Sequence, residues 1–164
     1  MPETQAKASF SHTFVNDRTT AKIHIYKVDK ESGKAAAQGD ASLEGAVYGL
    51  YARNDIVHPD GATGVVFKAG DLVATLTTDK NGEAEVSNLY LGNYYVKEIT
   101  PSEGYLLDEE EHDVVCDYEG DLVAEVSRST TSAEQVIKQP FQLIKVSDNG
   151  DDTEAGLLAG AEFT

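Results

Sequence analysis

Short stretches in which apolar and polar residues alternate occur along most of the chain. They are rich in β-branched and aromatic residues, and neighbouring stretches are separated by Gly, Asn, Asp or Pro. No window of eleven or more residues has the 3.6-residue spacing of an amphipathic helix. The pattern therefore predicts an all-β sandwich or barrel of short strands. The expected strands are 23–28, 46–51, 72–77, 85–86, 94–98, 114–116 and 122–126.

The turn signals predict how some of these strands are connected. An Asn-Gly pair within 79–83 is typical of tight β-hairpins, so we expect the flanking strands to pair. A second hairpin is expected between 114–116 and 122–126, around a Glu-Gly pair. The Gly-rich stretch 54–70 predicts a long, irregular loop.

A partial repeat indicates how the chain is divided. The pair Lys-Val follows apolar residues at 27–28 and again at 145–146. Each pair is followed by a Leu-x-Gly-Ala segment, at 43–48 after the first and at 158–163 after the second. The second copy stops at Thr164, which is too short to bury a sheet face alone. We therefore expect one complete β-domain and the opening of a second.

The charge of the chain excludes some classes of partner. Its 164 residues include 13 Lys and Arg against 29 Asp and Glu, a net charge of −16. Such a chain is repelled by nucleic-acid phosphates and by anionic membrane surfaces. No apolar run is long enough to insert into a membrane. The stretch 99–127 has ten acids and no Lys or Arg, and because their spacing fits no calcium loop we interpret them as a solvated strand edge.

Cysteine and histidine give no signal for a metal or catalytic site. Cys116 is the only cysteine, and its neighbours are apolar or acidic, so we interpret it as a small buried hydrophobe rather than a nucleophile. No nucleotide-binding or hydrolase motif occurs, and the histidines lack the spacing of a zinc site. We expect no metal, no cofactor and no enzymatic turnover. The four histidines are His12, His24, His58 and His112.

Five further motifs occur in a fixed order. They are Ile-x-Lys-Val-Asp at 25–29, Leu-x-Gly-Ala-x-Tyr at 43–48, Thr-Thr-Asp-x-x-Gly at 77–82, Leu-x-x-Gly-x-Tyr-x-Val-x-Glu at 89–98 and Pro-x-x-Gly-Tyr at 101–105. Together they resemble the SpaA-like, or Cna protein B-type, prealbumin-fold domain. The resemblance implies a prealbumin-like (Ig-like) antiparallel β-sandwich, flanked by fragments of neighbouring repeat domains.

The resemblance also implies a place for this domain in a longer protein. We expect 1–20 to be the closing strand and linker of a preceding domain, 21–139 the complete domain, and 140–164 the first strands of a following, truncated repeat. Such domains recur in the stalks of Gram-positive surface adhesins and pilins. The implied function is a structural spacer in an extracellular, cell-wall-anchored protein, with the neighbouring repeat domains as partners. The alternative is an adhesin module that contacts a host glycan or matrix protein through 54–70.

Two charged residues continue apolar strand faces. Lys27 shares strand parity with Ile23 and Ile25, and Glu98 shares parity with Tyr94 and Val96. A single buried charge is costly, so Lys27 and Glu98 are expected to pair.

The resemblance implies a chemical role for this pair. In the family a lysine at the position of Lys27 can form an intramolecular isopeptide bond to Asn or Asp on the last strand, while the glutamate matching Glu98 moves protons. Here Glu134 lies eleven residues before Lys145, the interval that separates Asn16 from Lys27, so a Glu stands in the acceptor position. Three alternatives stay open: a bond to Glu134, a bond to Asn16, or a buried Lys27–Glu98 ion pair with Glu134 nearby.

Overall fold

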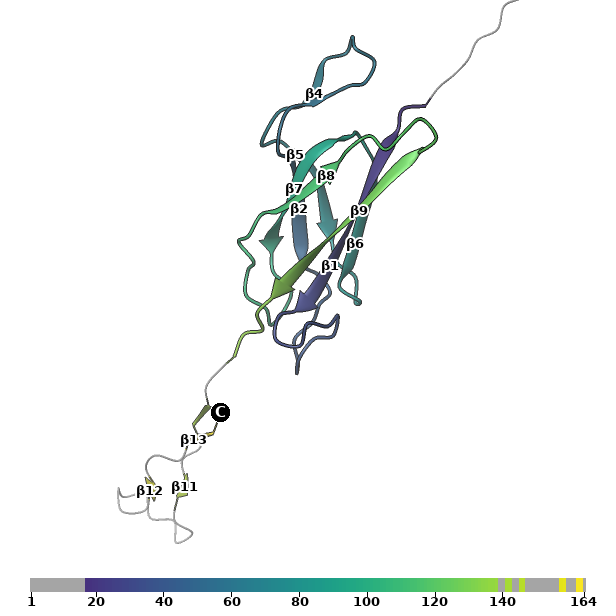
Figure 1. The fold of residues 1–164 in the computed structure, drawn as a ribbon. Coiled ribbons are helices and arrows are strands. Elements are labelled where there is room, and N and C mark those ends of the chain that lie inside the picture. Colours follow the sequence, from purple (N-terminus) through teal and green to yellow (C-terminus); the bar gives the residue numbers. More distant parts are fainter. Residues whose placement is uncertain (1–16, 139–140, 143–144, 147–156, 159–161, 164) are drawn as a thin grey trace, which may run out of the picture.

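In the part of the chain that the computed structural model describes, all regular structure is β-strand (Figure 1). The model describes residues 17–138, 141–142, 145–146, 157–158 and 162–163. In this part of the chain no helix is long and apolar enough to cross a membrane. The strands are β1 (Thr20–Asp29), β2 (Val47–Ala52), β3 (Ile56–Val57), β4 (Val65–Phe67), β5 (Leu72–Thr77), β6 (Glu83–Leu89), β7 (Gly92–Thr100), β8 (His112–Cys116), β9 (Glu125–Glu134), β10 (Phe141–Gln142), β11 (Lys145–Val146), β12 (Leu157–Leu158) and β13 (Glu162–Phe163).

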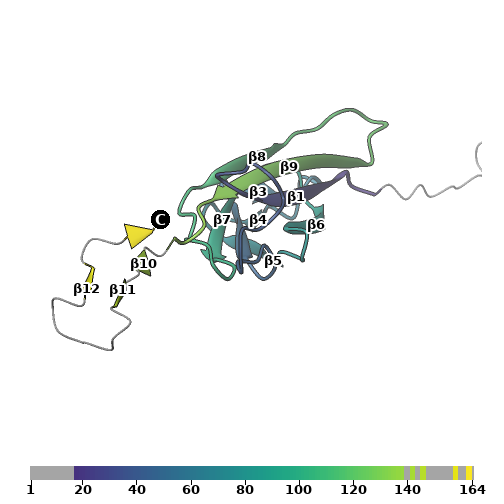
Figure 2. The ribbon, with the colours of Figure 1, turned by 90° about the horizontal axis from the view of Figure 1, so that it is seen from below.

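Two sheets pack face to face and confirm the predicted all-β sandwich. One has the strand order β6-β1-β9 and the other β5-β2-β7-β8. Alternate residues of each strand point into the space between the sheets, as the strand periodicity requires. Ile23, Ile25, Tyr48, Leu50 and Val96 fill this core. Seen from below, β8 and β9 lie along one side of the sandwich, where the two sheets approach each other (Figure 2).

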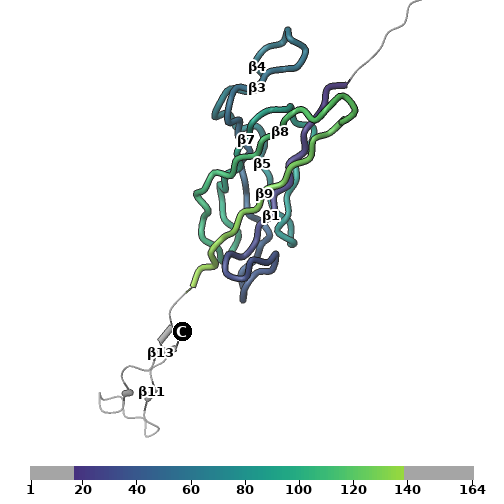
Figure 3. Tube along the Cα trace, in the orientation of Figure 1, coloured from purple at the N-terminus to yellow at the C-terminus, as the bar shows by residue number. Residues whose placement is uncertain are grey.

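The first and last strands of the sandwich are parallel neighbours, whereas the other described strand pairs are antiparallel. The register runs unbroken from Thr20 opposite Glu125 to Asp29 opposite Glu134. Figure 3 shows the two strands side by side along the length of the domain. The expected antiparallel sandwich is thus confirmed, with the parallel β1·β9 pair as the one exception among the described strand pairs. The alternation of apolar and polar residues could not predict this exception, because it does not indicate the direction of a strand.

Both predicted hairpins are wrong. The turn at 79–82 has the expected local chemistry, because the Asp79 carboxylate accepts the backbone N–H groups of Asn81 and Glu83. However, β5 pairs with β2 and β6 pairs with β1, so the turn carries the chain from one sheet to the other. The second expected hairpin fails in the same way, since β8 pairs with β7 and β9 with β1.

The stretch 54–70 is more regular than expected. It contains the short antiparallel pair β3·β4. Ile56 packs into the main core, while Val57 and Val65 are about half exposed. The excursion is therefore a small hairpin fixed to the sandwich at one point.

The C-terminal strands form two short antiparallel pairs, β10·β13 and β11·β12. Most of the expected following repeat at 140–164 lies outside the described residues. The same holds for most of 1–20, although β1 already begins at Thr20. The three domain limits therefore stay predictions.

Candidate functional site

Lys27 lies in the interior of the sandwich, on the inward face of β1. Its exposed fraction is 0%, and it follows Ala21, Ile23 and Ile25 on the same face. The strand needs no unusual geometry to bury it, because the alternation that places the isoleucines inward places position 27 inward as well. A charged group so placed needs partners of opposite charge.

Glu134 is the first of these partners. It is 2% exposed, and its Oε2 atom is in direct contact with the Lys27 Nζ atom. The parallel register accounts for this contact. Lys27 lies opposite Ser132, and Glu134 is the next residue of β9 on the same inward face. The structure thus brings the predicted lysine and the predicted glutamate together from strands 107 residues apart in sequence.

Glu98 of β7 is the second partner and comes from the opposite sheet. Its Oε1 atom lies 3.5 Å from Lys27 Nζ, and both side chains are fully buried. Its Oε2 atom accepts the backbone N–H of Asp108 at 2.8 Å, whereas Oε1 has no hydrogen bond within the described residues. Oε1 is therefore free to take or give a proton on the side that faces the lysine.

Burial acts in opposite directions on the amine and on this carboxyl. It lowers the pKa of Lys27, and the nearby Glu98 carboxylate opposes this shift only in part. Burial also raises the pKa of Glu98, against the opposing effects of the Asp108 N–H and of Lys27. Burial therefore disfavours the charged forms of both the Lys27 amine and the Glu98 carboxyl.

Two hydroxyl groups lie at the other oxygen of Glu134. Tyr48 on β2 donates its O–H to Glu134 Oε1 at 2.5 Å, and Ser132 Oγ lies 3.1 Å from the same atom. Burial raises the pKa of Tyr48, so its hydroxyl stays protonated and acts as a donor. The two carboxyl oxygens of Glu134 thus have different surroundings: Oε2 faces the amine, and Oε1 faces hydroxyl donors.

The ring of Tyr105 covers the lysine from the loop that follows β7. The Lys27 Nζ atom lies 4.7 Å from the ring centre, a cation–π distance. Tyr105 donates its O–H to the buried Asp29 carboxylate at 2.9 Å. That carboxylate also accepts the backbone N–H groups of Ser32 and Glu31 and an N–H of Gln38, and these bonds lower the pKa of Asp29 to about 2.

Sequence reasoning identified Lys27, Glu98 and Glu134 but missed the hydroxyl groups around them. Tyr48 carried a usable signal, because it belongs to a strand-forming motif and lies on the inward face of its strand. No sequence pattern indicated Ser132, because its position beside Glu134 depends on the pairing of β9 with β1. Asn16, the alternative acceptor, lies outside the described residues.

Other reactive groups in the described residues belong to β8 and to the segment before it. Cys116 is buried, as expected, and burial raises the pKa of its thiol to about 11. Asp108, Glu110 and His112 could each direct one ligand atom at a common point. The His112 Nε2 atom is already hydrogen-bonded to Asp108 at 2.8 Å, and Asp108 also accepts the N–H of Glu110.

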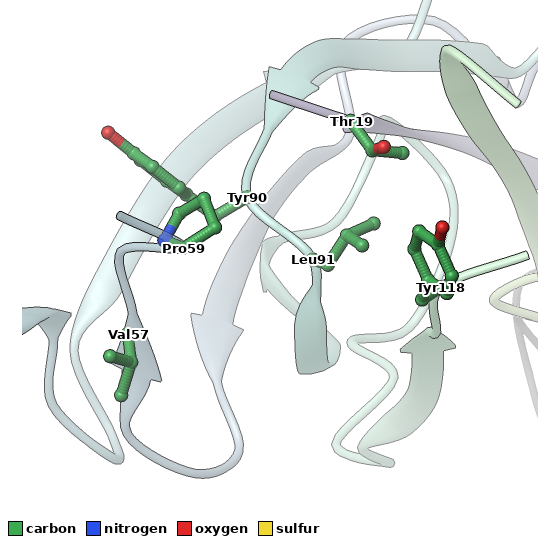
Figure 4. A pocket seen from close by; sticks show the side chains of 6 residues that line it. All are labelled: Thr19, Val57, Pro59, Tyr90, Leu91 and Tyr118. Carbon is green, nitrogen blue, oxygen red and sulfur yellow. The ribbon is translucent and has the colours of Figure 1, made fainter. Parts of the chain in front are cut away.

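A small pocket lies at the opposite end of β1 from Lys27. It encloses about 170 Å³ between the start of β1, the β3·β4 excursion and the loops that flank β7 and β8 (Figure 4). The guanidinium of Arg18 stacks 4.0 Å from the centre of the Tyr90 ring beside it. The pocket is lined by Thr19, Val57, Pro59, Tyr90, Leu91 and Tyr118.

Comparison with known proteins identifies the fold. A search of curated proteins finds no match. Among solved structures, the Bacillus anthracis TIE protein superposes with a TM-score of 0.54 at 21% identity, over 82% of this chain and 21% of that chain. The group B streptococcus pilus 2b backbone protein has a TM-score of 0.47 at 21% identity, over 74% of this chain and 43% of that one. The minor pilin GBS52 of Streptococcus agalactiae has a TM-score of 0.48 at 22% identity, over 77% of this chain and 48% of that chain.

The chain therefore spans between about a fifth and a half of the length of these three structures. The likeness to the first shows a shared fold. The model of the SpaA prealbumin-like fold domain matches residues 21–130, which is more than half of the sequence and runs from the second residue of β1 into β9. The chain belongs to the SpaA family of prealbumin-like fold domains.

Proposed function

We propose that this domain is a structural module of an extracellular, cell-wall-associated protein such as a pilin or an adhesin stalk, and that an amide bond between Lys27 and Glu134 joins its first and last strands. Membership of the SpaA family supports the structural role. The contact between the Lys27 amine and the Glu134 carboxyl, in a fully buried site, is the observation that supports the bond.

The proposed reaction is a condensation. Lys27 Nζ and Glu134 Oε2 share one proton. When the proton is on Nζ, the two groups form an ion pair. When it is on Oε2, a neutral amine lies beside a carboxylic acid. The neutral amine attacks Cδ of Glu134, while protonated Glu98 gives its proton to the Oε2 hydroxyl and takes one from the nitrogen in its place. Oε2 then leaves as water, Oε1 remains as the amide oxygen, and Glu98 returns to its starting state.

The surroundings of the carboxyl suit this reaction. In the tetrahedral intermediate the negative charge develops on Oε1, where the Tyr48 O–H donates a hydrogen bond. The site excludes water, so this donor is worth more than it would be in solution. Holding amine and acid in contact supplies an effective molarity of about 10⁵ M or more for well-oriented groups.

The acceptor is one methylene longer than the Asn or Asp that the resemblance implies. The register accommodates this extra length, because Glu134 lies opposite Asp29 rather than opposite Lys27. The Glu134 side chain therefore reaches back along the strand by two register positions, toward Ser132, to meet the amine.

The topology gives such a bond a mechanical consequence. Tension on the two ends of the chain enters through the start of β1 and leaves through the end of β9, and these strands are parallel neighbours. An amide bond between Lys27 and Glu134 carries the tension directly from one strand to the other. The sandwich between these two positions is then protected from extension.

Intact mass of the purified full chain tests the bond. We expect a mass about 18 Da below that of the sequence, because amide formation releases one water. Glu134→Ala should restore the sequence mass, and Lys22→Ala, which removes a partly exposed lysine on the outer face of β1, should keep the loss. A loss of about 17 Da would instead indicate an Asn acceptor such as Asn16, and an unchanged mass would leave a buried ion pair and reject the bond.

The finer partners of the domain remain proposals. We propose that the neighbouring repeat domains of the same chain are its partners and that the protein is displayed at the cell wall. Contact with a host glycan or matrix protein through 54–70 stays an untested alternative. Binding of a glycan array or of matrix proteins by the purified chain would favour that alternative.

A further inference from the structure

We propose that Ser132 donates a second hydrogen bond to the reacting carboxyl of Glu134, and that Asp108 and His112 control this donation from the surface. The proposal rests on the bond proposed above and adds a control to it. The side chains form a continuous chain from the buried site to the edge of the sandwich, with His112 14% exposed at the outer end.

The control arises because Ser132 has one hydrogen and two acceptors. Its Oγ atom lies 2.8 Å from Asp108 Oδ2 and 3.1 Å from Glu134 Oε1. Ser132 is 1% exposed, so its hydroxyl does not bond to bulk water instead of to these two acceptors. A hydroxyl donates to one acceptor at a time, so the two carboxyl groups compete for this hydrogen.

The charge of His112 affects how strongly Asp108 attracts the hydrogen of Ser132. The His112 Nε2 atom lies 2.8 Å from the same Oδ2 atom that faces Ser132. Burial alone would raise the pKa of Asp108, but the hydrogen bonds from His112, the Glu110 N–H and Ser132 together lower it, so Asp108 is an ionised acceptor. A positively charged His112 neutralises Asp108 and weakens its hold on the hydrogen of Ser132.

This hydrogen matters when the amine bonds to Cδ of Glu134. Negative charge then develops on Oε1, and the Ser132 hydroxyl turns from Asp108 to Oε1, beside the O–H of Tyr48. When Oε2 leaves as water, Oε1 becomes a neutral amide oxygen and the hydroxyl is free to turn back. Ser132 gains and loses no proton in the cycle. It touches the reacting group, whereas Asp108 and His112 are positioning residues.

Titratable groups surround His112 on its own segment and on the strands packed beside it. Asp108 and Glu110 face it from its own segment. From the strands packed beside it, Glu98 lies one hydrogen bond away through the Asp108 N–H, and Lys27 lies next to Glu98. Of these groups, the Asp108 carboxylate is the one in direct contact with the His112 ring.

The test starts from chains that have never folded. The segments 1–115 and 116–164 carry Lys27 and Glu134 separately, and Cys116 allows them to be ligated in denaturant into the full chain. Dilution into buffer then starts folding, and intact mass follows the loss of about 18 Da with time. Circular dichroism of each variant confirms that it has folded before its rate is compared.

Removal of the donor should slow the reaction. Ser132→Ala is expected to form the bond about 10²-fold more slowly than the wild type, the typical cost of one lost oxyanion donor. Ser132→Thr keeps the hydroxyl and should restore most of the rate. Equal rates for Ser132→Ala and the wild type would overturn the role of Ser132.

The two positioning residues should act with opposite sign. Asp108→Asn removes the competing charge and should leave the rate equal to or above that of the wild type, whereas a structural role would lower it. His112→Gln removes the charge that weakens Asp108 and should slow the reaction. The ratio of the wild-type rate to the His112→Gln rate should rise as the pH falls from about 8 to 5, where histidine gains its charge.

The outcomes separate this proposal from the one before it. A wild-type chain that folds without losing mass rejects the bond and the control together. A wild-type chain that loses about 18 Da, with a His112→Gln rate that equals its own at every pH, rejects the control and leaves the bond in place. Because His112 lies at the edge of the sandwich, this second comparison remains available if Ser132→Ala does not fold.

Discussion

At the scale of single residues, the centre of this domain is an amine between two carboxyl groups in a water-free interior. Lys27, Glu98 and Glu134 are all at most 2% exposed. A core that buries three ionisable side chains loses stability unless they satisfy one another. Their mutual contacts and the O–H of Tyr48 supply this except at Glu98 Oε1, which makes no hydrogen bond within the described residues.

A second buried carboxylate gives the first prediction, which concerns acid stability. The pKa of Asp29 is lowered from 3.8 to about 2 in the folded chain, so its hydrogen bonds add stability above pH 3.8 that is lost as the pH falls through about 2. Asp29→Asn should therefore unfold at a lower temperature at neutral pH and lose less of its stability between about pH 4 and 2.

Thermal unfolding measured by circular dichroism at a series of pH values checks this prediction. Asp121→Asn is the matched control, because Asp121 is exposed. If Asp29→Asn and Asp121→Asn lose stability in parallel as the pH falls, the Asp29 carboxylate does not contribute as described.

The sequence predicts the charged residues of the site better than its hydroxyl groups. Strand parity alone places Lys27 and Glu98 inward, because period-two alternation fixes the face of every residue in a strand. The resemblance adds Glu134. Ser132 could not be predicted in the same way, because its distance to Glu134 and Asp108 is set by the register of β9 against β1.

At the scale of strands and turns, the sequence predicts the positions of strands better than it predicts which strands pair. The expected strands 72–77 and 94–98 lie within β5 and β7, yet the partners of β5 and β6 were mispredicted. An Asn-Gly turn specifies only that the chain reverses locally. Which strands then pair depends on how the two apolar faces close over one core, and that is a property of the whole sandwich.

The turn after β5 gives the second prediction. Gly82 has φ +78°, and an added Cβ atom would lie 2.7 Å from the backbone oxygen of Lys27. The neighbouring Lys27 N–H donates to the Gly82 oxygen at 2.7 Å, so neither backbone can move away freely. Gly82→Ala should lower the free energy of unfolding by about 2–4 kcal/mol, through backbone strain and the steric clash together.

Denaturant unfolding measures this loss, with Gly61→Ala as the control. Gly61 has a similar φ of +73° but nothing within 4 Å of an added Cβ atom, so its substitution reports the backbone strain alone. We expect it to cost about 1–2 kcal/mol. Equal losses for the two variants would mean that the contact with the Lys27 backbone adds nothing.

At the scale of the whole molecule, the parallel pairing of the terminal strands sets the mechanical behaviour. Chain ends that leave from β1 and β9 load this pair along its length. Without a covalent joint, tension is resisted by the hydrogen bonds between the two strands and by core packing. With an amide bond between Lys27 and Glu134, the tension bypasses the segment between these two residues, which lie 107 positions apart in the sequence.

Single-molecule pulling on the full chain gives the third prediction. The wild type should show no unfolding step for the segment enclosed by the bond. Lys27→Ala should show a step of roughly 350–390 Å, the extended length of 107 residues. A wild-type step of that length would show that the segment is not enclosed by a covalent bond.

The most direct measurement of the central claim is tryptic peptide mapping of the unfolded, digested chain. An amide on Lys27 blocks cleavage after it, so we predict a branched peptide that joins 23–30 to 129–138, lighter by about 18 Da than the sum of the two. Fragmentation should place the link at Lys27 and Glu134. Recovery of the unlinked peptide 129–138 together with cleavage after Lys27 would contradict the account.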